Sequence, residues 1–289
     1  MSRRSIRVKK MSFEGAGGWF SAYTYLLQGL AELGYKVKLV DSFQDADIAF
    51  VGVALLSEAE SKVVYAPIEG FLERRPEVRA RKAFVVTSRF SYECVGGEAD
   101  GIVYHGVPRL SRVGELVDVA VSVSGTTDSG VVRKFHTFRK NVEAYVSLLK
   151  RYRLSVACNK WFPHPELCDI VADRPYLYAR ALLYLSRAEG FGLPVAEAMA
   201  SGVPVAYLDA PAYNEFAQGE KIPAVFRGFE RFTLPRAPPM LVPSYEPASL
   251  EAVYFSLKRL LGSRRTVEYR PTPRDMAQQL VEEYLLRKL

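Results

Sequence analysis

The sequence contains few cysteines, few histidines and no long uninterrupted apolar segment. Its 289 residues include three cysteines (Cys94, Cys158 and Cys168) and three histidines. The cysteines are odd in number and lack paired spacing, so they predict unpaired thiols in a reducing compartment rather than a disulfide framework. A zinc site built from Cys158, His164 and Cys168 is disfavoured, because no fourth ligand stands at a standard spacing.

No apolar run approaches the ~20 residues that cross a bilayer, and the basic N-terminus leads into strand-like alternation instead of a signal peptide. We therefore expect an intracellular, cytoplasmic protein. The net charge of +7 is spread along the chain, unlike that of a nucleic-acid-binding arm. The N-terminal basic residues and segment 73–82 favour at most a weak peripheral association with an anionic membrane at its inner face. Segment 133–153 is also strongly basic, and either a solvated helix face or a phosphate site would explain it.

Hydrophobic periodicity predicts two successive series of strands and helices. Short apolar strands alternate with helical segments in the first hundred residues, and a second series begins near residue 115. Such alternation is typical of parallel sheets covered on both faces, so we expect an α/β fold with two doubly wound domains. The expected boundaries are 1–110 and 111–265, followed by a C-terminal helix within 266–289.

The C-terminal part of the sequence predicts a surface segment and two helices. The proline-rich segment 234–247 should run over the surface, because proline is disfavoured in helices and central strands. Amphipathic helices are predicted at about 247–262 and 273–288. The apolar stripe of the last helix, which must be buried against another element, consists of Met276, Leu280, Tyr284 and Leu285.

The segment LSRAEGFGLPVAEAMASGVPVAYLD is the most informative. Glu189 follows the apolar run LLYLS, at the strand end where open α/β sheets bind ligands. Gly190 and Gly192 allow the backbone to approach a ligand closely. Pro194 suits the first turn of a helix, whose positive dipole end favours an anion. Glu197 is expected in that first turn, where a carboxylate can accept hydrogen bonds from a diol such as a ribose.

The string EGFGLPVAEAMASGVPV resembles the signature of the retaining glycosyltransferases of family four, in which seven residues separate two glutamates. The resemblance implies the GT-B fold, with two Rossmann-like domains facing across a cleft that holds a nucleoside-diphosphate sugar. It implies that Glu197 binds the donor ribose and that Glu189 acts beside the reacting sugar. The turn would line the sugar and the diphosphate through the backbone of Gly190, Phe191, Gly192 and Leu193.

The element RKN at 139–141 resembles the family's Arg/Lys-Lys-Gly/Asn element. This implies that Lys140 neutralises the leaving diphosphate. The family usually has an arginine after the glycine that ends the preceding strand, but this chain has Thr126 after Gly125. A second positive charge would then come from Arg133 or Arg139.

The N-terminal half resembles the family only in outline. GAGGWF resembles its glycine loop, whose Gly17 and Gly18 would face the diphosphate. His105, in YHGV, stands where the family commonly has Asn-Gly-Val. The final helix resembles the one that crosses back onto the family's N-terminal domain. The resemblance is detailed for about residues 116–216.

These features predict a retaining, hexosyltransferase-type enzyme that needs no metal and no cofactor besides its nucleotide-sugar donor. Asp45 and Asp47 precede a strand rather than follow one, so DAD indicates a turn and not a metal site. The sequence does not identify the acceptor, which could be a lipid-linked glycan, a polysaccharide, a protein or a DNA base.

Two alternatives also stay open. A non-catalytic nucleotide-sugar-binding protein is favoured by the absence of an arginine after Gly125. An NAD-dependent oxidoreductase is suggested by Gly15, Gly17 and Asp41, which imitate the dinucleotide fingerprint. Phe20 occupies the position of its third glycine, and this alternative leaves the two glutamates unexplained.

Overall fold

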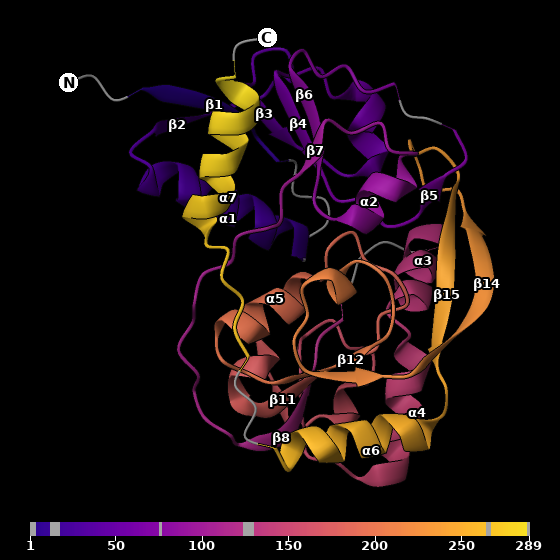
Figure 1. Ribbon diagram of the computed structural model, residues 1–289. Helices are drawn as coiled ribbons and strands as arrows, with labels where there is room; N and C mark the ends of the chain where they lie inside the picture. Colours follow the sequence, from indigo (N-terminus) through magenta and orange to yellow (C-terminus); the bar gives the residue numbers. More distant parts are fainter. Residues whose placement is uncertain (1–3, 12–17, 75–76, 124–129, 264–266, 288–289) are drawn as a thin grey trace. The chain divides into compact units, whose positions relative to one another are not determined.

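The computed structural model describes residues 4–11, 18–74, 77–123, 130–263 and 267–287 (Figure 1). The chain forms two compact units. Unit 1 is drawn from Met1–Pro108, Arg231–Val242 and Arg270–Leu289, and unit 2 from Arg109–Glu230 and Pro243–Tyr269. Among the helices of the described ranges, none combines the length and the apolar composition needed to span a bilayer.

Unit 1 contains a parallel sheet of six strands in the order β2-β1-β3-β4-β6-β7. Because the chain winds from β1 to β2 on one side and from β3 to β7 on the other, the switch point lies between β1 and β3. The strands are β1 (Ser5–Lys9), β2 (Lys36–Val40), β3 (Ile48–Phe50), β4 (Val63–Ala66), β6 (Ala83–Val86) and β7 (Gly101–Ile102). The helical elements are α1 (Gly18–Glu32), η1 (Val53–Glu58) and α2 (Arg89–Cys94).

The C-terminal segment packs onto the first helix of unit 1. Helix α7 (Pro273–Gln279) continues into the π-helical segment η5 (Leu280–Leu285), and α7 lies against α1. Gly29 of α1 permits this approach, because a Cβ there would lie 1.9 Å from the Pro273 carbonyl oxygen. Three residues of the predicted apolar stripe are buried, namely Met276, Leu280 and Leu285.

Unit 2 repeats the doubly wound pattern with the strand order β10-β9-β8-β11-β12-β13, again all parallel. Its switch point lies between β8 and β11, where the chain reverses its direction of winding. The strands are β8 (Val117–Val121), β9 (Val156–Cys158), β10 (Ile170–Val171), β11 (Ala179–Tyr184), β12 (Val205–Leu208) and β13 (Glu220–Ile222). The helical elements are α3 (Val131–Arg139), α4 (Val142–Tyr152), η2 (Pro165–Leu167), η3 (Pro175–Tyr178), α5 (Leu193–Ala200), η4 (Tyr213–Glu215) and α6 (Leu250–Leu261).

The basic segment 133–153 contains two helices, because α3 ends at Arg139 and α4 begins at Val142. Asn141 lies between the two helices in a left-handed conformation, with φ of 53°. Asparagine is one of the few residues other than glycine that adopts this conformation readily. The break therefore depends on Asn141, and Lys140 sits at the end of α3 rather than at the start of α4.

The prediction that 234–247 runs over the surface outside a sheet was wrong. Strand β15 (Met240–Pro247) is the middle strand of a small sheet, between β14 (Ala224–Phe232) and β5 (Phe71–Leu72). Pairing with β5 is restricted to Met240 with Leu72 and Leu241 with Phe71. Pro243 lies beyond the last of these pairs, so its missing N–H removes no hydrogen bond to β5.

The expectation of three unpaired cysteines was also wrong, because Cys158 and Cys168 form a disulfide. Strand β9 ends at Cys158, and β10 pairs beside it from Ile170 onward. The connection therefore returns next to its own start and brings the two Cα atoms to 5.9 Å. With both sulfurs bonded, neither is available to a zinc site with His164. Cys94 is a buried free thiol.

Candidate functional site

The turn that carries Glu189 follows β11 at the switch point of unit 2. Two buried tyrosines hold its backbone. The Tyr145 hydroxyl of α4 accepts a hydrogen bond from the Leu185 N–H at 2.6 Å. The Tyr213 hydroxyl donates to the Ser186 carbonyl oxygen at 2.6 Å. Because both anchors come from other elements, the position of Glu189 depends on the packing of the whole unit.

Gly192 makes the sharp turn into α5. Its φ is 94°, which L side chains rarely adopt, and a Cβ there would lie 2.8 Å from the Tyr213 Cβ. Both conformation and space therefore require glycine at this position. Helix α5 begins at Leu193, with Pro194 in its first turn as predicted.

Glu197 lies in the second turn of α5, not in the first turn as expected, because the helix begins one residue earlier than predicted. The side chain is buried, and its Oε2 accepts a hydrogen bond from the Tyr176 hydroxyl at 3.1 Å. The Phe191 ring is stacked on Phe216 with centroids 4.6 Å apart. The Phe191 side chain therefore packs within the protein, and the predicted ligand contacts of Gly190 to Leu193 through their backbone stay a prediction.

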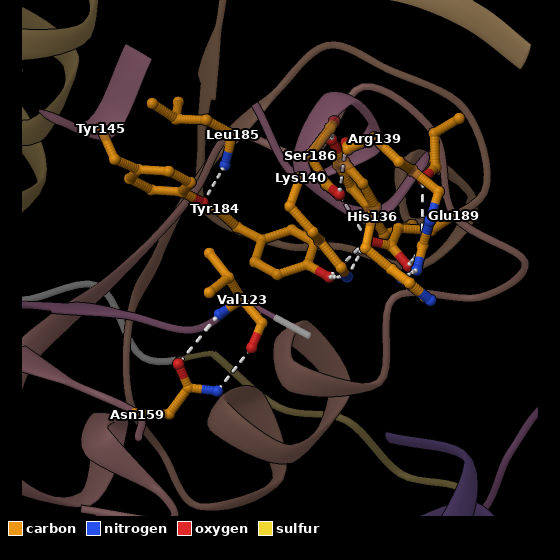
Figure 2. Close-up of polar contacts among 12 residues, drawn as sticks. Val123, His136, Arg139, Lys140, Tyr145, Asn159, Tyr184, Leu185, Ser186 and Glu189 are labelled. Carbon is orange, nitrogen blue, oxygen red and sulfur yellow. Dashed lines mark hydrogen bonds and ion pairs between the residues drawn. The ribbon is translucent and has the colours of Figure 1, made fainter. Parts of the chain in front are cut away.

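A buried ion cluster joins the end of α3 to the turn after β11 (Figure 2). Arg139 Nη1 donates to Glu189 Oε2 at 2.5 Å, and Lys140 Nζ contacts Oε1 of the same carboxylate. The Tyr184 hydroxyl donates to Oε1 at 2.8 Å and accepts from Lys140 Nζ at 3.1 Å. Ser186 Oγ also contacts Oε1. Two cations thus share one carboxylate.

The cluster determines the protonation states of its members. Burial alone would raise the pKa of Glu189, but Arg139 and Lys140, with hydrogen bonds from Lys140 and Ser186, lower it to about 2. Burial and the Glu189 charge raise the pKa of Tyr184 well above its ordinary value. At neutral pH the carboxylate is therefore charged and the phenol is protonated.

His136 completes the surroundings of Arg139. Burial, followed by the charges of Arg139 and Lys140, lowers the pKa of the imidazole to about 3, so it is neutral. Its Nδ1 lies 3.4 Å from Arg139 Nη2 and can only accept there, since a guanidinium has no acceptor. Buried cations stabilise negative charge on a bound group more strongly than the same cations would in water.

The structure separates the two arginines that the sequence offered as the second cation. Arg139 is buried in the cluster, whereas Arg133 is exposed on the same helix. Gly18 is the first residue of α1. Four residues that the sequence singled out lie outside the described residues, namely Gly15, Gly17, Gly125 and Thr126.

Two other candidates have structural roles in unit 1. Asp47 forms an ion pair with Lys62 at 2.7 Å and accepts a hydrogen bond from the Arg7 N–H at 2.8 Å. His105 is buried, its Nδ1 lies 2.8 Å from the Tyr65 hydroxyl, and burial lowers its pKa to about 3. Within the described ranges, no group of three or more His, Cys, Asp or Glu side chains is arranged to hold a metal ion.

Tyr184, Ser186 and the two anchoring tyrosines were not among the residues predicted from the sequence. A usable signal existed for Tyr184 and Ser186, because they are the polar residues in the run LLYLS, next to the strand end where a site was expected. Tyr145 and Tyr213 carried no such signal. Each looks like an ordinary core tyrosine until the fold brings its hydroxyl to the turn.

No protein-family model matches the chain. A segment of 89 residues is 32% identical to the serotype-specific mannosyltransferase WbdA of Escherichia coli. The match covers 27% of this chain and 11% of that protein. The chain thus matches only about a tenth of the length of this relative.

Solved structures match over nearly the whole chain. Sucrose-phosphate synthase of Thermosynechococcus elongatus has a TM-score of 0.58 at 13% identity, over 98% of this chain and 95% of that chain. HepE of Anabaena, in complex with UDP and glucose, has a TM-score of 0.55 at 12% identity. The match covers 98% of this chain and 96% of that chain. Likeness at this identity shows the fold. The predicted fold class, α/β with two Rossmann-like units of the GT-B type, is confirmed.

Proposed function

We propose that this protein is a glycosyltransferase that moves a sugar from a nucleoside-diphosphate donor to an acceptor, with retention and without a metal ion. The observation that carries the proposal is the buried cluster of Arg139, Lys140 and Glu189, located at the switch point beside the glycine turn that opens α5. The GT-B fold and the segment similar to a mannosyltransferase support the reaction class. The HepE complex with UDP supports a nucleotide-sugar as donor.

In this proposal the donor diphosphate lies against the positive side of the cluster. Arg139 and Lys140 are both cations, and the start of α5 adds the positive end of a helix dipole. Glu197 accepts hydrogen bonds from the ribose hydroxyls. Glu189 has two tasks, since it holds both cations in place and presents its carboxylate near the donor sugar.

The reaction breaks the bond between the sugar C1 and the phosphate oxygen and forms a bond between C1 and an acceptor hydroxyl oxygen on the same face. The acceptor proton passes to an oxygen of the leaving phosphate. Negative charge grows on the diphosphate while the sugar becomes oxocarbenium-like. Arg139 and Lys140 stabilise that growing negative charge without reorganising, because the cluster already holds them in position.

Calorimetric titration with UDP, GDP and ADP, each beside its nucleoside, tests the site. Lys140→Met should weaken the binding of the cognate diphosphate about 10- to 100-fold, because a charge-assisted contact is lost. Nucleoside binding should be nearly unchanged. Lys150→Met, which removes an exposed lysine of α4, is the matched control. An equal loss for nucleoside and diphosphate would show that Lys140 acts through folding alone.

A donor-hydrolysis screen across UDP-, GDP- and ADP-sugars with EDTA present tests the activity. We expect turnover of one donor class, with the first-formed sugar keeping the donor's anomeric configuration by NMR. Loss of turnover in EDTA that manganese or magnesium restores would contradict metal independence. Diphosphate binding without turnover of any donor would favour a non-catalytic nucleotide-sugar-binding protein.

A further inference from the structure

Unit 2 has a pocket on the side of α3 that points away from Glu189. Its volume is about 500 Å³, within the range of small-molecule sites. On a helix, Arg133, Lys134 and Thr137 project to one side, whereas His136 and Arg139 project to another. The pocket is therefore separate from the ion cluster. The residues that matter for its chemistry are Arg133, Lys134, Phe138, Asn141, Glu143 and Arg187.

Two buried nitrogen atoms at this pocket have no acceptor among the described residues. The Asn141 residue is only 4% exposed. Its Oδ1 accepts from Arg187 Nη2 at 3.2 Å, but its Nδ2 has no hydrogen-bond partner. Arg187 Nε is likewise buried without a partner. Since nearly all buried donors in folded proteins are satisfied, these two indicate a ligand that supplies acceptor oxygens.

The pocket also has an excess of positive charge. Arg133 and Lys134 are exposed, and neither forms an ion pair within the described part of the chain. The Arg187 guanidinium lies 4.5 Å from the Phe138 ring centroid and pairs with Glu246 at 3.0 Å. Burial nevertheless lowers the pKa of Arg187, so its surroundings disfavour its charge. A bound anion would offset that penalty and meet the two exposed cations.

We propose that this pocket binds a phosphate group carried on a polyol. The phosphate oxygens accept from Asn141 Nδ2 and Arg187 Nε and face the charges of Arg133 and Lys134. A phosphate monoester has three terminal oxygens, enough to meet two donors and two cations at once. Glu143, the acidic residue of the lining, accepts hydrogen bonds from the polyol hydroxyls. Soluble polyol phosphates carry such a monoester, whereas phospholipid headgroups such as phosphatidylglycerol carry a phosphate on a polyol as a diester with two terminal oxygens.

The test is a calorimetric titration with glycerol 3-phosphate in the presence of saturating UDP, which fills the proposed donor site. The double variant Arg133→Gln/Lys134→Gln should raise the dissociation constant about tenfold or more, because two charge-assisted contacts are lost. The matched control Lys150→Gln/Arg151→Gln removes the same charge from exposed positions of α4 and should change it less than about twofold. Equal losses in the two double variants would overturn the proposal.

A second variant tests the unsatisfied amide. Asn141→Gly retains the left-handed backbone but removes Nδ2, so it should also weaken glycerol 3-phosphate about tenfold. Unchanged affinity in this variant would overturn the assigned binding mode.

Vesicles of phosphatidylglycerol, compared with phosphatidylcholine alone, distinguish the source of the phosphate. Sedimentation with phosphatidylglycerol that is lost in Arg133→Gln/Lys134→Gln, but kept in the α4 control, would support a lipid headgroup as the ligand. Binding of neither probe would overturn the proposal, as would displacement of glycerol 3-phosphate by UDP. If the protein binds none of UDP, GDP and ADP, the proposed function fails, while the comparison of the two double variants still decides whether this pocket exists as a site.

Discussion

Replacing Glu189 by glutamine tests the energetics of the ion cluster. The change retains the shape of the side chain but leaves Arg139 and Lys140 without their shared anion. The pKa of Glu189 is about 2 in the folded protein against an ordinary value of 4.5, which corresponds to about 3 kcal/mol of stability. Breaking a buried ion pair by removing one partner usually costs about 3–5 kcal/mol. We expect Glu189→Gln to lower the free energy of unfolding by about 3–5 kcal/mol near neutral pH.

The pH dependence makes the prediction specific. Because folding lowers the pKa, the stabilisation is fully present above about pH 4.5 and is lost as the pH falls toward about 2. The difference in unfolding free energy between wild type and Glu189→Gln should shrink over that interval. Urea unfolding followed by circular dichroism at about pH 7, 4 and 2.5 measures it. Glu143→Gln, which changes an exposed acid of α4, serves as the control and should cost little at each pH.

Two results would refute this reasoning. A loss below about 1 kcal/mol at pH 7 would mean that the carboxylate does not compensate the two buried cations. A difference that stays constant down to about pH 2.5 would mean that the lowered pKa of Glu189 is not the source of the stability.

Four other changes probe the fold. Gly29→Ala should lower the melting temperature, because a Cβ would lie 1.9 Å from a carbonyl oxygen of α7, and overpacking of this kind costs about 1–3 kcal/mol. Deletion from Arg274 onward should also lower it, and unchanged melting in both variants would contradict the packing of α7 on α1. Reduction of the Cys158–Cys168 disulfide should cost about 3 kcal/mol, from the chain entropy of a loop of about ten residues, and urea midpoints with and without dithiothreitol measure this. Asn141→Ala should be less stable than Asn141→Gly by about 1 kcal/mol, because only glycine relieves the strain of a φ of 53°, and equal denaturation midpoints would contradict that reasoning.

The sequence predicted much of the fold because parallel strands buried on both faces leave a plain apolar signal. Strands β4, β6 and β11 form at the apolar segments VVYA, AFVV and LLY, and the glycine turn before α5 follows β11. The failures share a different cause. The pairing of β15 with β5 joins segments distant in the chain, and the pairing of β10 with β9 depends on the path of the connection between them. No local pattern encodes either pairing.

The candidate site was likewise predicted only in part from the sequence. Local sequence determined the glycine turn, the two glutamates around it and the basic pair at 139–140, because conformation and charge belong to the residues themselves. Only the tertiary structure decided which cations meet Glu189. Arg133 and Arg139 lie on one helix and are chemically alike, but the packing of α3 buries Arg139 against the carboxylate and leaves Arg133 exposed. A buried ion pair needs desolvation and contact at about 3 Å, and both are created by packing rather than by residue type.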